Sequence, residues 1–292
     1  MKKVSINIGG RHIGGSSLAA ANGLSPWTSP LELAVRLKTG VTPNVFSEEQ
    51  IHRMELGTAL EPHARNLFTK KTGIKVDMPE TGFADDEHPF LVAHLDGICK
   101  DAVIELKWSE KGFGEIPIHY KAQACQYMDI MNLKKTWFGV LGPSSFKIFE
   151  YKYDPHFHLP LKKGAIAFWE KYVEGGEYPP VDSSHSSGKG LKALYPDDNG
   201  DILETNPKME ELLKKRSDLD APKKELDLIN NQIKELLKDN SFYNSEEYGR
   251  ISYKKTKDSF KWKALSKVDL SKEERVKFIE EKKGTRTLRF QK

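Results

Sequence analysis

The stretch that decides the fold, residues 91–107, reads LVAHLDGICKDAVIELK. Apolar and polar residues alternate in both of its halves, which is typical of β-strands. The polar pair Lys100-Asp101 between the halves is typical of a tight turn. The sequence therefore predicts an antiparallel hairpin in which Cys99 pairs with Ala102.

This register places two carboxylates opposite each other. Asp96 lies across from Glu105, and Lys107 shares the face of Glu105 because side chains two positions apart on a strand point the same way. Opposed Cβ atoms stand about 4.5–5.5 Å apart, so the carboxylates repel each other. Hard cations such as Mg²⁺ or Mn²⁺ bind carboxylate oxygens and relieve this repulsion. The segment predicts a metal site, with an exposed face of ordinary salt bridges as the alternative.

Length and composition suit a globular protein. The chain has 292 residues, enough for one large domain or a core with an appendage, and 30% of them are charged. It contains no apolar run of membrane-spanning length, and its first residues lack the pattern of a secretory signal. Cys99 and Cys125 form neither a disulfide framework nor a zinc pattern, so we expect reduced thiols in the cytosol.

Composition also suggests a division of the chain. The Ser- and Gly-rich stretch 183–190 predicts a boundary, which separates a core at 1–180, a linker at 181–200 and an appendage at 201–292. The core mixes helical and strand-like patterns and predicts an α/β fold with a mixed sheet. The appendage is expected to be mainly helical, with short basic strands. The net charge of the chain is +4, and the excess of Lys and Arg over Asp and Glu lies in this appendage, which is compatible with nucleic acid binding.

Periodicity and capping place the core's other elements. Ser47, followed by Gln50, resembles a capping box that opens a helix reaching about Thr72. Helical spacing and alternation predict the rest. We expect helices at 16–21, 30–38, 120–132 and 159–173, and strands at 137–141 and 146–151.

The spacing Asp-x8-Glu-x-Lys across a hairpin resembles the signature of PD-(D/E)XK nucleases. Three further segments resemble the lambda-exonuclease/YqaJ-like viral recombinase family within that superfamily. They are the opening at 13–33, the acidic helix GTALEPHARNLF at 57–68 and the helix AQACQYM at 122–128. The likeness covers about residues 11–175 and implies a restriction-endonuclease-like core, with a central mixed sheet flanked by helices.

The resemblance also implies roles in catalysis. Asp96 and Glu105 would be the main metal ligands, helped by the Leu106 carbonyl and by Glu61 from its helix. Lys107 would orient or deprotonate the attacking water and stabilise negative charge on the phosphate. The reaction would be in-line phosphodiester hydrolysis with Mg²⁺, or alternatively Mn²⁺, as cofactor.

Five residues are expected to contact DNA or phosphate. Gln126 is the better match to the family's glutamine and Gln123 the second choice, with an ordinary polar helix residue as the alternative. Ser16 would line the 5′-phosphate end of the groove or cap a helix. Arg11 lies near the position of the family's phosphate-binding arginine, although its spacing to Ser16 is short. His94 either binds phosphate or packs.

The implied function is an exonuclease that resects double-stranded DNA ends 5′ to 3′ and leaves 3′ strands for a single-strand annealing recombinase. The family also implies a ring-shaped trimer, and the cytoplasm of a bacterial host if the gene belongs to a phage or prophage. An endonuclease or structure-specific nuclease on the same fold stays open, as does a non-catalytic DNA- or partner-binding module. Basic and aromatic residues at 248–263 fit either nucleic-acid contact or docking of a partner.

Overall fold

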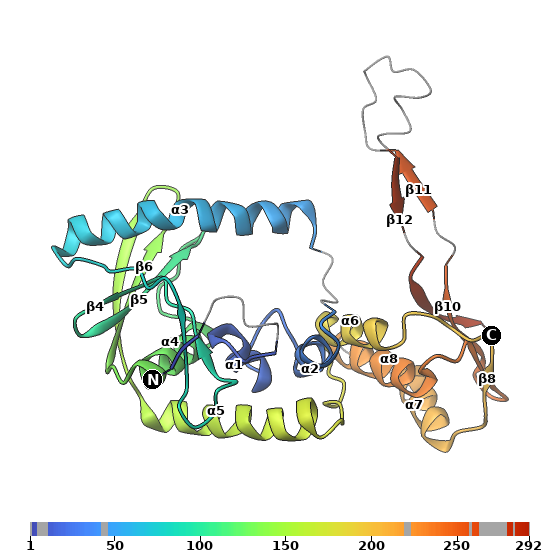
Figure 1. Cartoon of the computed structure of the whole chain (residues 1–292). Helices are drawn as coiled ribbons and strands as arrows, with labels where there is room; N and C mark the ends of the chain where they lie inside the picture. The colour runs from blue at the N-terminus through green and yellow to red at the C-terminus, as the bar shows by residue number, and fades with distance from the viewer. Residues whose placement is uncertain are drawn as a thin grey trace, which may run out of the picture. The chain divides into compact units, whose positions relative to one another are not determined.

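The structure is a computed structural model that describes residues 2–4, 11–41, 46–218, 223–256, 259–262, 279–282 and 284–291. The chain divides into two compact units, Met1–Pro180 and Val181–Lys292 (Figure 1). Each unit has a hydrophobic core of its own. Among the helices so described, none is long and apolar enough to span a membrane.

A four-stranded mixed sheet organises the first unit. Its order is β4-β5-β6-β7, in which β4 and β5 are antiparallel, β5 and β6 parallel, and β6 and β7 antiparallel. Flanked by helices, it confirms the predicted α/β class. The strands are β4 (Gly97–Cys99), β5 (Ala102–Trp108), β6 (Lys135–Leu141) and β7 (Phe146–Lys152).

The predicted hairpin register is confirmed, because Cys99 pairs with Ala102. The first strand, however, is broken. β4 begins at Gly97, after a bend at Asp96, and the preceding short strand β3 (Val92–Ala93) pairs instead with β2 (Gly82–Ala84). β2 also pairs with β1 (Lys2–Val4), which makes a separate three-stranded sheet.

Helices cover both faces of the main sheet (Figure 1). On one face, α3 (Glu48–Thr72) packs Ala64 and Phe68 into a cluster with Ile104 and Leu106. On the other, α4 (Ile118–Met131) packs against Val103. Such double covering is usual for parallel strands, and it buries both faces of β5.

Local capping accounts for the start and end of α3. The Ser47 hydroxyl accepts a hydrogen bond from the Gln50 N–H, and the Gln50 side chain accepts one from the Ser47 N–H. The helix ends at Gly73, whose φ of 72° favours glycine. Both boundaries predicted from the sequence are confirmed.

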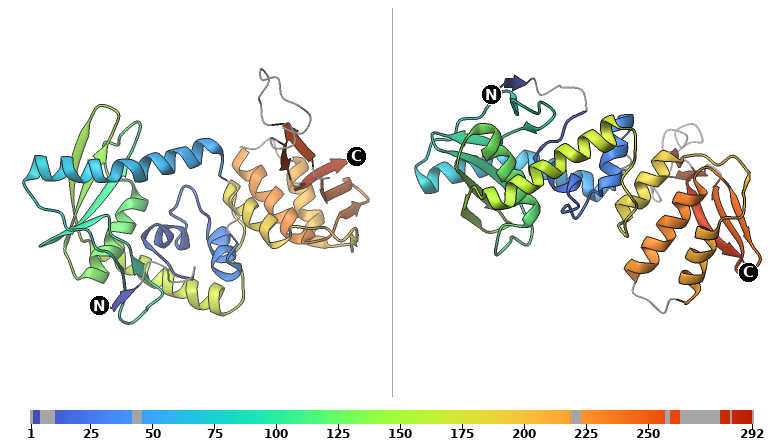
Figure 2. Two further views of the ribbon diagram at one scale, coloured as in Figure 1. Left: turned by 45° about the horizontal axis from the view of Figure 1, so that its top comes forward. Right: turned by 90° about the horizontal axis from the view of Figure 1, so that it is seen from below.

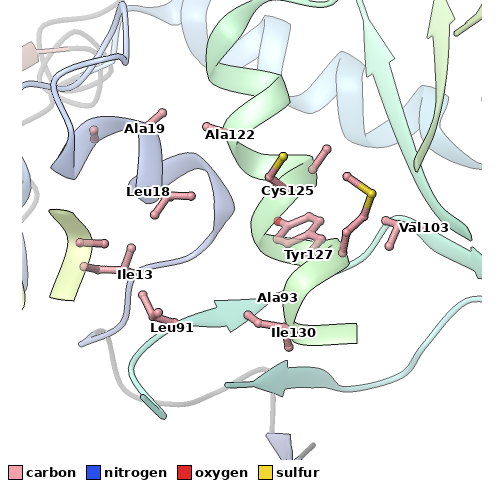
Figure 3. Close-up of a cluster of buried hydrophobic side chains, with 14 of the residues drawn as sticks. Ile13, Leu18, Ala19, Leu91, Ala93, Val103, Ala122, Cys125, Tyr127 and Ile130 are labelled. Atoms are coloured by element: carbon pink, nitrogen blue, oxygen red, sulfur yellow. The ribbon is translucent and has the colours of Figure 1, made fainter. Parts of the chain in front are cut away.

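Further helices complete the first unit. Figure 3 shows side chains from the N-terminal segment and from β3 gathered around α4, in the cluster that fixes α1 against α4. The helix expected at 159–173 begins earlier and changes at its end to a π-helix. These elements are α1 (Gly15–Ala21), α2 (Pro30–Thr39), α5 (Pro155–Phe168) and η1 (Trp169–Glu174).

The second unit is a sheet with helices on one face (Figure 2). Its strand order is β13-β10-β9-β8, so the basic strands expected here form a full sheet. The stretch expected to be a linker contains α6, which the Asn231 amide holds by donating to the carbonyls of Asp182 and Ser184. β11 and β12 form a separate hairpin. The elements are α6 (His185–Leu194), β8 (Ile202–Leu203), α7 (Pro207–Asp218), α8 (Lys223–Leu237), β9 (Phe242–Ser245), β10 (Gly249–Lys255), β11 (Ser259–Trp262), β12 (Ile279–Lys282) and β13 (Arg286–Gln291).

Candidate active site

The predicted catalytic residues come together beside β5. Lys107 Nζ lies 2.5 Å from Glu105 Oε1, and the Glu105 side chain is only 1% exposed. Asp96 is not in the strand, but its Oδ2 accepts a 2.8 Å hydrogen bond from the Leu106 N–H. That bond holds Asp96 next to β5, although the pairing of β4 with β5 begins only at the following residue, Gly97.

α3 contributes Glu61 to the same region. Glu61 Oε1 pairs with Arg65 at 2.6 Å, and the Arg65 guanidinium also donates to the Asp96 carbonyl at 3.1 Å. Burial and the negative charge of Asp96 raise the pKa of Glu61, although the charge of Arg65 opposes this. The helix thus brings a third carboxylate close to the pair predicted from the hairpin.

The cluster has an excess of negative charge. Burial, with the neighbouring charge of Asp96, raises the pKa of Glu105 to about 8. Burial also raises the pKa of Asp96. Burial alone would lower the pKa of Lys107, but the charges of Glu105 and Asp96 outweigh it and raise that pKa. One ammonium therefore faces more negative charge than it neutralises, which an added cation would relieve.

One buried oxygen points to how such a cation would be held. Glu105 Oε2 is buried and has no hydrogen-bond partner among the residues that the structure describes, which is unfavourable for a carboxylate. Within the described ranges, no three His, Cys, Asp or Glu side chains already form a metal-binding group. The donors would be Asp96 and Glu105, with the Leu106 carbonyl and water oxygens completing the set. This oxygen-rich set fits Mg²⁺, which keeps several waters when bound to proteins.

The cluster opens into a cleft of about 450 Å³. Glu61, Asp96 and Lys107 line it, together with the α3 residues Gly57 and Thr58. The ammonium of Lys107 also lies 4.9 Å from the centre of the Tyr120 ring, which lines the same cleft. A phosphodiester in this cleft would lie against the carboxylates and the lysine at once.

A smaller pocket of about 90 Å³ adjoins the cleft, and Tyr120 lines both. Gln123 lines the pocket and links it to the carboxylate cluster, because its amide donates to Glu105 Oε1 at 2.8 Å and to the Tyr127 hydroxyl at 3.1 Å. The exposed Ser16 lines the pocket too.

Two residues of this pocket were not predicted from the sequence. Arg36 of α2 donates to the Ser17 hydroxyl at 3.2 Å and brings a half-buried positive charge. His119 has a buried Nε2 without a hydrogen-bond partner in the described part of the chain, and burial together with the charge of Lys107 lowers its pKa. The helical spacing between His119 and Gln123 could have indicated His119 as a pocket residue, but nothing in the local sequence marks Arg36.

Of the two predicted glutamines, the structure brings Gln123 and not Gln126 into contact with the cluster. Gln126 is 2% exposed, and its amide donates to the carbonyls of Ile13 and Val92 at 2.9 and 2.8 Å. It fastens the N-terminal segment and β3 to α4 and does not face the cluster. Gln123, the second choice, is the glutamine that contacts Glu105.

Arg11 and His94 lie away from the cluster. The exposed Arg11 donates to the carbonyl of Lys38 near the end of α2. His94 packs against Gly82, where a Cβ atom would come within 2.6 Å of the imidazole ring, and its ring centre is 5.8 Å from that of His12. Their positions fit packing and helix-end contacts, because neither lines the cleft or the pocket.

Comparisons with known proteins agree with the sequence resemblance. Residues 7–134 match the family model described as the YqaJ-like viral recombinase domain. The uncharacterized protein YqaJ of Bacillus subtilis (strain 168) is 29% identical over 279 residues, which cover 85% of this chain and 85% of that protein.

Two solved structures resemble part of the chain more distantly. An alkaline exonuclease from Laribacter hongkongensis matches with a TM-score of 0.48 and 19% identity, over 56% of this chain and 89% of that one. A phage-related exonuclease from Haemophilus somnus 129PT matches with a TM-score of 0.45 and 15% identity, over 56% and 94%.

Proposed function

We propose that the protein, whose residues 7–134 match the YqaJ-like viral recombinase domain, is a metal-dependent exonuclease that hydrolyses phosphodiesters at the ends of double-stranded DNA. The observation that carries the proposal is the buried group of Asp96, Glu105 and Lys107, which opens into a cleft and keeps one carboxylate oxygen without a partner. A salt-bridge network that served stability alone would satisfy that oxygen.

Asp96 and Glu105 would hold Mg²⁺ or Mn²⁺, which polarises a phosphodiester and makes water more acidic when bound. Lys107, fixed between Glu105 and the Tyr120 ring, would donate hydrogen bonds to the attacking water and to a phosphate oxygen. Glu61, held by Arg65, would accept a hydrogen bond from a water at the edge of the site. Hydrolysis would then proceed in line, without a covalent intermediate.

The adjoining pocket supports an exonuclease rather than an endonuclease. Its small volume fits a single phosphate group, and Ser16, Arg36 and Gln123 would supply hydrogen bonds and positive charge to it. A terminal 5′-phosphate held there would lie next to the catalytic group, because Gln123 contacts Glu105 directly. We therefore propose 5′ to 3′ polarity, which would leave 3′ strands for phage-type recombination. The ring-shaped trimer and the annealing recombinase stay predictions from the family resemblance.

The test uses a linear duplex labelled separately at its 5′ and 3′ ends, with Mg²⁺ or with a chelator. We expect early release of the 5′ label, loss of cleavage with chelator and loss in Glu105→Gln. Asp101→Asn is the matched control, because this exposed carboxylate on the same hairpin pairs with Lys135 far from the cleft. The wild type should cut a 5′-hydroxyl end more slowly than a 5′-phosphate end. The Arg36→Gln variant should cut both ends at the same rate.

Two results would contradict the proposal. Cleavage of covalently closed circles at the rate of linear duplex would assign the protein to the endonucleases. Absence of metal-dependent cleavage on any DNA, by protein shown to be folded, would leave a non-catalytic binding module.

A further inference from the structure

Among the residues that the structure describes, helices cover one face of the sheet in the second unit. Tyr243, Ile251 and Tyr253 belong to the core that α7 and α8 close. Because side chains alternate along a strand, the intervening residues point to the opposite face. In β10, Arg250 and Lys254 lie on that second face.

Cross-strand pairing extends this open face over three strands. Ser252 of β10 lies between Phe242 of β9 and Arg289 of β13, and Arg250 lies between Asn244 and Gln291. Arg250, Lys254 and Arg289 are all exposed. We call Phe242, Arg250, Lys254 and Arg289 the basic face.

The basic face carries positive charge that forms no ion pairs among the described residues. Unlike Lys255, which pairs with Asp197, none of its three cations forms an ion pair within the part of the chain that the structure describes. The described strand residues of this face include no acidic side chain. Asp198, outside these strands, interacts electrostatically with Lys254 without forming an ion pair with it. Three exposed cations on one rigid sheet fit a polyanion.

Phe242 adds a flat surface at the centre of this charge. The guanidinium carbon of Arg250 lies 3.8 Å from the centre of the Phe242 ring, and Lys254 Nζ lies 5.0 Å from it. The ring is half-buried, so it is held in place by the sheet. Aromatic rings and guanidinium planes are the surfaces on which unpaired bases stack, whereas the bases of a duplex stack on each other.

We propose that the basic face binds single-stranded DNA. Arg250, Lys254 and Arg289 would contact backbone phosphates, and a base would stack on the platform made by Phe242 and Arg250. The site goes beyond the proposed nuclease activity, because it would retain the strand that a resecting enzyme leaves behind. It needs no metal and no cleavage, so it is tested separately from catalysis.

The test measures fluorescence anisotropy of a labelled 20-nucleotide oligothymidylate with the full chain, in chelator so that nothing is cut. The triple variant Arg250→Gln, Lys254→Gln, Arg289→Gln should bind at least 10-fold more weakly. The slope of log K against log salt should become shallower by about 2, since each phosphate contact on a single strand contributes about 0.7. A matched triple, Lys208→Gln, Lys214→Gln and Lys224→Gln, removes the same charge from exposed positions on α7 and α8 and should bind like the wild type.

Phe242→Leu tests the stacking. It should weaken binding of the oligothymidylate several-fold while leaving binding of an abasic oligomer of equal length unchanged, since only a base can stack on the ring. Circular dichroism and thermal melting verify that every variant is folded.

Three outcomes would overturn the proposal. The first is an equal loss of affinity in both triple variants, which would indicate non-specific charge. The second is wild-type behaviour of Phe242→Leu together with equal affinity for duplex, which would indicate a duplex-binding surface. The third is that, in chelator, the wild type and the triple variant of the basic face bind the oligothymidylate equally weakly or not at all, which would favour a protein partner at this face.

Discussion

Two clusters in the first unit place a lysine among carboxylates, and they differ in how fully the carboxylates are satisfied. Beside β5, Lys107 lies 2.5 Å from Glu105. Between α4 and α5, Lys162 Nζ lies 2.6 Å from Asp85 and 2.8 Å from Asp129. Both clusters combine the same residue types in one domain, so composition alone does not distinguish them.

Hydrogen bonding does distinguish them. In the second cluster, Asp129 is approached by His158 and Lys162 and accepts from the Tyr153 hydroxyl, and these neighbours lower its pKa. Burial alone would raise the pKa of Asp85, but Lys162 and the His88 N–H outweigh it and lower that pKa.

At the β5 cluster the balance is reversed. Burial and like charge raise the pKa of Glu105, and Oε2 of this residue has no partner. The comparison teaches that satisfied carboxylates stabilise the fold, while unsatisfied ones are available to a ligand.

The largest effect should come from Glu105→Gln, which removes a charge and keeps the shape. We expect the cleavage rate to fall by roughly 10³-fold, while the free energy of unfolding is unchanged or rises by about 1 kcal/mol, because burial disfavours the charged form. Mg²⁺ should raise the Tm of the wild type but not of the variant. If instead the variant keeps the Mg²⁺-dependent rise in Tm, Glu105 does not hold the ion.

Lys162→Met should have the next largest effect, and on stability rather than activity. It leaves Asp85 and Asp129 facing each other without their shared cation, so we expect a loss of about 2–3 kcal/mol, discounted because the cluster is partly exposed. Urea denaturation measures this loss, and Lys163→Met at the exposed neighbouring position is the control. Cleavage per folded molecule should stay near the wild-type value, and a 100-fold loss would contradict the division into structural and catalytic clusters.

The two glutamines of α4 test whether structural and catalytic roles are also separated within one helix. Gln126→Leu leaves the carbonyls of Ile13 and Val92 without their donor and should destabilise the protein by about 1–2 kcal/mol with little change in cleavage. Gln123→Leu should lower cleavage about 10-fold and leave the Tm within the range of surface variants. The opposite pattern would restore Gln126 as the site residue.

The smallest effect should appear in the pH dependence of stability. The pKa of Asp129 is lower in the folded state than the unfolded value of about 3.9, so its contribution is present above about pH 4 and is lost as pH falls toward the folded pKa. Asp129→Asn should therefore be less stable than the wild type by about 1 kcal/mol at pH 7, with a difference that shrinks below pH 4.

For Glu105 the pH dependence of stability is opposite, because its pKa is raised in the folded state. The stability of Glu105→Gln relative to the wild type should therefore increase as pH rises from about 4 to 8. Denaturation curves at several pH values measure how the stability of each variant relative to the wild type changes with pH. If both differences changed in the same direction, the contrast between the two clusters would be contradicted.

Much of the first unit was predictable from the sequence because its signals are local. The hairpin register follows from alternation on both sides of one tight turn, and α3 follows from the capping pair Ser47 and Gln50. The nearness of Asp96, Glu105 and Lys107 follows from that same register, which needs only 12 residues of chain between 96 and 107.

Other features required the tertiary structure. Gln123 and Gln126 are three residues apart on one helix, so they lie about 60° apart around its axis and periodicity does not separate them. Which of the two contacts Glu105 depends on how α4 packs against α1 and β3. The presence of Arg36 in the smaller pocket depends on the position of α2.

The basic face marks the same limit in the second unit. The sequence by itself determined that basic and aromatic residues are mixed along 248–255. β10, however, pairs with β13, whose residues begin 31 positions after β10 ends. Only that distant pairing brings Arg289 beside Arg250, and only the packing of α7 and α8 decides which face stays open. Local periodicity states which residues share a side of a strand, whereas the burial of apolar surface by distant elements decides which side faces solvent.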